Sequence, residues 1–127
     1  MPEGQEQAPS AEAELRSLCF ALHLDAAVVR RFIGDYLRLL EFRLDRIDRD
    51  LANGDTPSAV VGLLSLATSS SMVGASGVAE TAQQLRHHAA AGNLTAVAED
   101  RTRLVAQARS AHARLAQIES ADIGVPA

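Results

Sequence analysis

Residues 25–54 read DAAVVRRFIGDYLRLLEFRLDRIDRDLANG and contain a long periodic pattern of apolar residues. The apolar residues recur at steps of four and three, which is the spacing of one face of an α-helix. These positions are Val29, Ile33, Tyr36, Leu40, Leu44, Ile47 and Leu51. Asp25 can cap the start of the helix, and Gly54 suits the left-handed position after its end. The stretch predicts one amphipathic helix of about 26 residues or more.

The polar face of this helix carries opposite charges four residues apart. The pairs are Arg31–Asp35, Asp45–Arg49 and Arg46–Asp50. Each such pair adds only about 0.2–0.5 kcal/mol to helix stability. We therefore interpret this face as solvated rather than as a charged binding site.

Four further helices are expected around this one. Ser10 can cap a short helix over 11–22, and Asp55-Thr56-Pro57 is typical of a helix start. The other expected helices run from 56 to about 73, from about 76 to 91 and from about 94 to 120. In the helix after Pro57, the expected core positions are Ala59, Leu63, Leu66, Ser70 and Val73.

The predicted fold is all-α, because no strand pattern competes with these helices. Short connections make consecutive helices antiparallel neighbours. We expect an up-down-up-down antiparallel four-helix bundle with a short extra N-terminal helix. Residues 1–10 are predicted to be a flexible tail, 11–120 the bundle and 121–127 a frayed C-terminus.

Composition excludes several functional classes. The chain has 127 residues, a net charge of -4 and 12 basic residues, every one of them Arg. This mild acidity argues against a nucleic-acid partner, and the absence of Lys excludes catalysis by Lys. No apolar run approaches the roughly 20 residues of a membrane span, and residues 1–10 do not resemble a signal peptide. We expect a cytoplasmic protein with no membrane partner, in which the single Cys19 packs in the core.

The histidines form no metal motif. His23, His87, His88 and His112 lack the i,i+3 and i,i+4 partners of helical metal sites. The adjacent His87 and His88 are interpreted as surface or capping residues near a helix C-terminus. No cofactor, no metal and no enzymatic activity are expected, because no acid, base and nucleophile occur together in the sequence.

Residues 63–75, LLSLATSSSMVGA, contain an unusual polar run inside an expected helix. This stretch resembles the motif of histidine-containing phosphotransfer (HPt) domains, approximately A-H-x-L-K-G-S-(S/A)-x-x-(L/V)-G-A. The matching residues are Leu66, Ser69, Ser70, Val73, Gly74 and Ala75. Flanking patterns at 32–37, 44–55 and 85–93 are also similar to the family, and the resemblance covers about 12–118. It implies a four-helix bundle that works in a two-component phosphorelay.

The chain departs from the HPt motif at the positions that carry its chemistry. The phospho-accepting His of the family falls on Leu64, its Lys on Ala67 and its Gly on Thr68. Leu has no nucleophile, so phosphoryl transfer at position 64 is chemically impossible. The loss of Lys also removes the cation that would balance a phosphate at this site.

The helical phase predicts an exposed patch centred on Leu64. The expected partner-binding residues are Val60, Leu64, Ala67, Thr68 and Ser71. The expected partner is the receiver domain of a response regulator or a histidine kinase, with a homodimer as a further option. Packing of Leu64 against the N-terminal helix or a tail is the structural alternative. Two other functions remain open: phosphotransfer through His87 or His88, and a general helical dimerisation module.

Overall fold

The computed structural model describes residues 10–121, and this part of the chain folds into five α-helices with no strand. The helices are α1 (Ala11–Leu22), α2 (Ala26–Ala52), α3 (Thr56–Met72), α4 (Ser76–Ala90) and α5 (Leu94–Glu119). The all-α prediction is therefore confirmed for these residues, and the predicted helix ends lie close to the observed ones. Most of the predicted N-terminal tail and of the predicted frayed C-terminus lies outside the described residues.

Local side-chain caps begin four of the helices. The carboxylate of Asp25 accepts the backbone N–H of Val28 at 3.0 Å, and that of Asp55 accepts the N–H of Ser58 at 3.2 Å. Ser10 and Asn93 cap α1 and α5 in the same way. These bonds satisfy backbone donors that the first turn of a helix leaves free. The helix boundaries therefore follow from short-range chemistry that is visible in the sequence.

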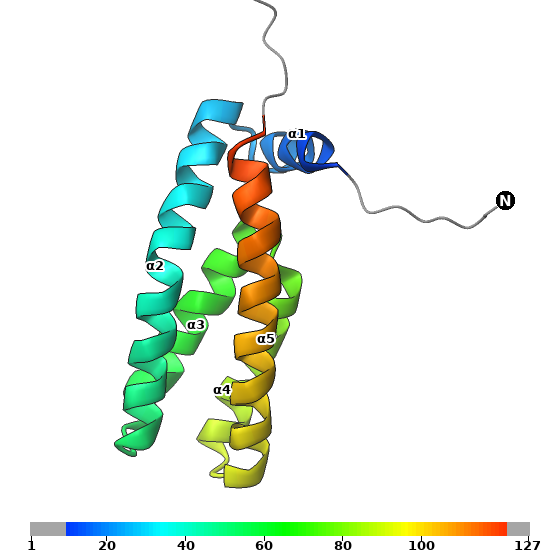
Figure 1. The fold of residues 1–127 in the computed structure, drawn as a ribbon. Coiled ribbons are helices and arrows are strands. Elements are labelled where there is room, and N and C mark those ends of the chain that lie inside the picture. The colour runs from blue at the N-terminus through cyan, green and yellow to red at the C-terminus, as the bar shows by residue number, and fades with distance from the viewer. Residues whose placement is uncertain (1–9, 122–127) are drawn as a thin grey trace, which may run out of the picture.

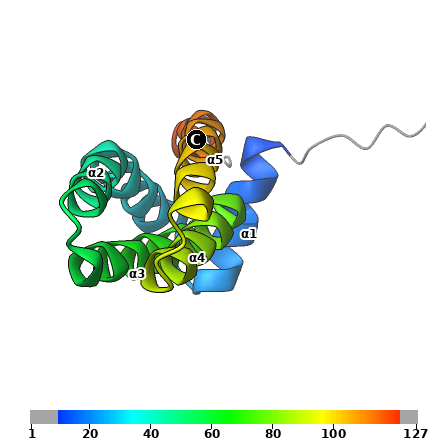
Figure 2. The same ribbon diagram turned by 90° about the horizontal axis from the view of Figure 1, so that it is seen from below.

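The helices α2, α3, α4 and α5 run alternately in opposite directions, and α1 lies across one end of them (Figure 1). Viewed along their length, α3 lies beside α4, while α2 contacts both α3 and α5 (Figure 2). The arrangement is compatible with an antiparallel bundle. Leu15 of α1 is fully buried, so this helix closes one end of the apolar core. The other largest fully buried side chains are Ile33, Ile47, Leu63, Leu66, Leu85, Leu115 and Ile118.

One buried polar contact crosses the core between α2 and α3. Ser70 is fully buried, as predicted, and its Oγ lies 2.7 Å from the phenol oxygen of Tyr36. The bond satisfies two hydroxyl groups that would otherwise be buried without partners. Burial raises the pKa of the Tyr36 phenol above its ordinary value of 10.0.

The three ion pairs predicted on the outer face of α2 do not form among the described residues. Asp35 instead pairs with Arg38, and Asp48 accepts a bond at 3.0 Å from Arg101 of α5. The prediction was wrong for Asp35 because spacing within a helix allows a partner three residues away as well as four, and Asp35 pairs with the former. Asp48 lies close enough to α5 to find a partner there.

The end of α5 is held against α2. Nε of Arg30 donates to the carbonyl oxygen of Ala121 at 2.8 Å, and Ala121 is buried. Ala121 therefore does not fray, although it is the first residue of the segment predicted to do so. No helix in the described part of the chain has the length and apolarity that a membrane span requires.

Candidate docking surface

The outward face of α3 exposes Leu64, the position at which the HPt motif has its phospho-accepting histidine. The Leu64 residue is 41 % exposed, and Thr68 and Ser71 are also exposed. Leu64 thus does not pack under the N-terminal helix. An exposed leucine alone carries no functional meaning, so the neighbours of Leu64 decide whether the face is a candidate site.

Two of the predicted patch residues are less exposed than the prediction required. Ala67 is only 3 % exposed and belongs to the core, and Val60 is half-buried. Ser71 is exposed but lines a separate hollow with Ala67 and Ala79, on the side of α3 that faces α4. The small alanines let α4 approach α3 closely enough to cover one flank of it. Helical phase predicts which residues share a face, but it does not predict how far a neighbouring helix covers that face.

Leu64 and Thr68 instead line a hollow together with residues of α2. The hollow has a volume of about 400 Å³. Its lining consists of Phe32 and Arg43 from α2 and Leu64, Ser65, Thr68, Ser69 and Met72 from α3. Met72 is 44 % exposed, so the apolar part of the surface extends about two helical turns beyond Leu64. Sequence reasoning did not include Phe32 or Met72 in the site.

Arg43 provides a cation at this surface. Its Nη1 donates to Oγ of Ser69 at 2.7 Å, and Ser69 Oγ donates in turn to the carbonyl oxygen of Ser65 at 2.8 Å. These two bonds hold the guanidinium group of α2 against α3. The expectation that the site lacks a cation was therefore wrong. No local signal reveals Arg43, because it belongs to a different helix and precedes Ser69 by 26 residues.

A second, larger hollow continues this surface toward the start of α3. Its volume is about 510 Å³, and it shares Arg43 and Ser65 with the first hollow. Phe42 and Val61 line it and are 57 % and 66 % exposed. We call the two joined hollows the α2–α3 groove. The groove combines exposed apolar side chains with the cations of Arg43 and Arg46 and the carboxylate of Asp50.

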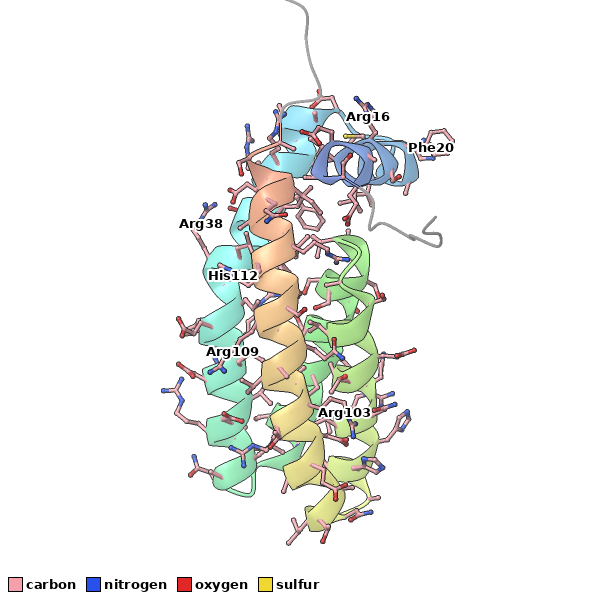
Figure 3. All side chains as sticks on the ribbon, turned by 45° about the vertical axis from the view of Figure 1, so that its right-hand side comes forward. Arg16, Phe20, Arg38, Arg103, Arg109 and His112 are labelled. Atoms are coloured by element: carbon pink, nitrogen blue, oxygen red, sulfur yellow. The ribbon has the colours of Figure 1, made fainter. Side chains whose placement is uncertain are left out.

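The histidines occupy different environments. His23, His87 and His112 are exposed, and His112 lies on α5 beside α2 (Figure 3). His88 is half-buried, and its Nδ1 lies 2.5 Å from Oδ2 of Asp100. The interpretation of His88 as a surface or capping residue was incomplete, because this contact joins α4 to α5. Within residues 10–121, no group of three or more His, Cys, Asp and Glu side chains is arranged to hold a metal.

Asp100 is a buried charge that sequence reasoning missed. Its side chain is only 4 % exposed, and Nη1 of Arg103 donates to its Oδ1 at 3.0 Å. Arg103 projects from α5 near α4 (Figure 3) and also donates to Oε1 of Gln84 on α4 at 3.2 Å. The carboxylate is thus contacted by one guanidinium group and one imidazole nitrogen, and partners of this kind are how a buried charge is accommodated. Asp100 lies three residues after Val97 and four before Leu104, so helical spacing places it on the buried face of α5, and this signal could have identified it.

Comparison of the chain with protein-family models, with curated proteins and with solved structures finds no match to any of them. The resemblance to HPt domains therefore rests on the residues quoted for it.

Proposed function

We propose that the chain is an HPt-like signalling module that binds a partner protein and carries no phosphate at the position usual for that family. In this proposal, α2 to α5 form the four-helix bundle of an HPt domain and α1 is the extra N-terminal helix. The module acts by docking in a two-component phosphorelay, as an adaptor or an inhibitor, and not as an enzyme.

The observation that carries the proposal is the environment of Leu64. The residue stands where the HPt motif has its histidine, it is 41 % exposed, and it lines a hollow that also contains Arg43 and Met72. A hollow bordered by apolar side chains and a cation supports protein binding, since such surfaces combine hydrophobic burial with a charged contact. The same position supports no covalent chemistry, because a leucine side chain has no lone pair with which to attack phosphorus.

The favoured partner is a receiver domain, and the α2–α3 groove is the surface proposed to meet it. Full burial of Leu64 would contribute about 1.5–3 kcal/mol before the costs of association. A histidine kinase and a second copy of the chain are the alternatives, and each has a distinct outcome in the binding experiment.

The test is direct binding of the full chain to a panel of receiver domains, measured by calorimetry for the wild type and for Leu64→Asp. We expect micromolar or tighter binding for at least one receiver, and a loss of at least tenfold in the variant. Val105→Asp on α5 is a matched control, because Val105 is 38 % exposed and lies outside the groove. Circular dichroism checks that both variants keep the helical content of the wild type.

Three results would contradict the proposal. Equal binding of the wild type and Leu64→Asp would show that the groove is not the surface that binds the partner. Binding to histidine kinases alone would exclude the receiver as partner. A homodimer in light scattering that Leu64→Asp dissociates, with no receiver affinity, would identify a general dimerisation module instead.

A further inference from the structure

The outer side of α2 and α5 has a hollow that the docking proposal does not use. Its volume is about 370 Å³. Its lining includes Leu37, Glu41, Leu44 and Asp45 of α2 and Arg109 and His112 of α5, and we call this surface the α2–α5 face. Viewed along the bundle, α2 and α5 form one side of it, and no other helix of the described part lies over their outer side (Figure 2). A partner can therefore reach the hollow.

Opposite charges stand on the two sides of this hollow. Glu41 and Asp45 are exposed on the α2 side, and Arg109 and His112 are exposed on the α5 side, where they lie next to α2 (Figure 3). None of these four side chains forms an ion pair with another described residue. Arg38, a further cation at this hollow, already has a carboxylate partner on its own helix. The face thus has one acidic edge and one basic edge.

The two edges lie at matching heights along the helices. α2 and α5 run in opposite directions, and the bond of 3.0 Å from Nε of Arg101 to Oδ1 of Asp48 fixes their register. Glu41 lies seven residues before Asp48, and Arg109 lies eight residues after Arg101. Because the rise per residue is the same in both helices, Glu41 and Arg109 lie at about the same height on either side of the hollow.

We propose that the α2–α5 face binds the same face of a second copy of the chain in a two-fold symmetric dimer. The two-fold axis runs parallel to the helices, so α2 of each chain lies over α5 of the other and every residue keeps its height. Glu41 of each chain then lies opposite Arg109 of the other, which gives two identical ion pairs. An axis across the helices would place α2 over α2, with acidic edge against acidic edge, and like charges facing one another oppose binding.

The face is large enough for a stable dimer. α2 and α5 have 27 and 26 residues, so each is about 40 Å long, and two adjacent helices are together about 20 Å wide. The resulting area of about 800 Å² matches what each partner contributes to a standard interface. Leu37 and Leu44 are half-buried and would lose their remaining contact with water. Side chains from four helices then fill the space between the facing hollows, as they do in a four-helix bundle.

A second copy is favoured over other occupants because the face is complementary to itself. An occupant has to present a basic edge over Glu41 and an acidic edge over Arg109, with apolar side chains between them. The chain presents both edges at matching heights, so symmetry supplies the complement. The hollow shares no lining residue with the α2–α3 groove, so the inference does not depend on the docking proposal.

The experiment measures the mass of the full chain by light scattering after size exclusion, over a range of protein and salt concentrations. We expect the wild type to dimerise, with a dissociation constant that rises with salt. Glu41→Arg places a cation opposite Arg109 of the second copy, and Arg109→Glu places an anion opposite Glu41. Each variant alone should therefore bind itself at least about tenfold more weakly than the wild type. Circular dichroism checks that both variants keep the helical content of the wild type.

Mixing the two variants tests the symmetry directly. In a mixed dimer, one chain has arginine at both positions and the other has glutamate at both, so each of the two contacts again joins opposite charges. We expect the equimolar mixture to form a dimer about as tight as that of the wild type, although neither variant does so alone. An attraction between Glu41 and Arg109 within one chain would not produce this rescue.

Further variants separate this face from the groove. Leu64→Asp should dimerise like the wild type, so a failure of the docking proposal would leave this result unchanged. Val105 also lines the hollow, so Val105→Asp should weaken the dimer while each chain keeps its affinity for a receiver. A wild type that stays monomeric up to about 100 μM would overturn the proposal. A dimer that both charge variants keep, a mixture that stays monomeric, or a dimer that Leu64→Asp dissociates would overturn it as well.

Discussion

The phenol oxygen of Tyr36 lies 2.7 Å from Oγ of Ser70, and this bond joins α2 to α3 inside the core. Ser70 belongs to the polar run that carries the HPt resemblance, yet it is fully buried. One hydroxyl of that run is therefore structural. The exposed Leu64 and Thr68 belong to the opposite side of the same helix, where a partner has access to them.

The burial of Tyr36 predicts a loss of stability at alkaline pH. Burial raises the pKa of Tyr36 in the folded protein above the value of 10.0 that applies when the chain unfolds. The unfolded state then loses its proton first. The contribution of the phenol to stability is complete below pH 10 and is lost as pH rises through the folded pKa.

The chain has one tyrosine and no tryptophan, so the ultraviolet absorbance of tyrosinate reports this single group. We expect a titration midpoint above 10.0 in the native protein and a return to the ordinary value in concentrated urea. Tyr36→Phe should remove this part of the pH dependence and cost about 1 kcal/mol at neutral pH. A native midpoint at or below the ordinary value would contradict the expected burial.

The position of the docking surface predicts different effects for two adjacent residues. Met72 lines the hollow that contains Leu64, whereas Ser71 lines the hollow beside α4. Met72→Asp should weaken receiver binding about tenfold or more, because it places a charge where an apolar side chain is buried in the proposed complex. Ser71→Asp should leave the dissociation constant within about twofold of the wild type. The reverse order in calorimetry would favour the patch predicted from helical phase.

The buried carboxylate of Asp100 predicts a stability cost that an exposed carboxylate does not have. Asp100→Asn removes the charge that His88 and Arg103 both contact and should lower the free energy of unfolding by about 1.5–3 kcal/mol. Asp48→Asn is the control, since Asp48 is bonded to Arg101 but its side chain is 46 % exposed. We expect a cost below about 1 kcal/mol there, measured by urea unfolding of both variants. Equal costs would mean that Asp100 is solvated in solution.

Gly54, in the turn between α2 and α3, has a left-handed backbone conformation, so we expect substitutions there to lower the stability of the protein. Gly54 has a φ of +72°, and nothing lies within 4 Å of a Cβ added to it. Gly54→Ala should therefore destabilise the protein by about 1 kcal/mol through backbone strain alone. Gly54→Asn should cost less, because Asn adopts the left-handed region more readily. Thermal unfolding followed by circular dichroism distinguishes the two, and an alanine variant as stable as the wild type would rule out the strain.

The positions of the five helices follow from short-range chemistry, and for that reason they were accessible from the residues alone. The apolar period of 25–54, the cap at Asp25 and the glycine at 54 each act within a few residues of where they stand. The same holds for the burial of Ser70, since helical phase places it with Leu63 and Leu66. The missing nucleophile at position 64 is likewise a property of one side chain and needs no fold.

The composition of the candidate sites depends on contacts between helices. Ala67 is buried and not part of the exposed patch, because α4 covers it. Arg43 lies at the surface beside Leu64 because α2 packs next to Ser69. Helical spacing places Asp100 on the buried face of α5, but only the packing of α4 against α5 brings His88 to it. A periodic pattern records which side of a helix is apolar, because each residue contributes its own hydrophobicity. It does not record the distance, rotation or residue register of the neighbouring helix, which arise from the packing of all the helices together.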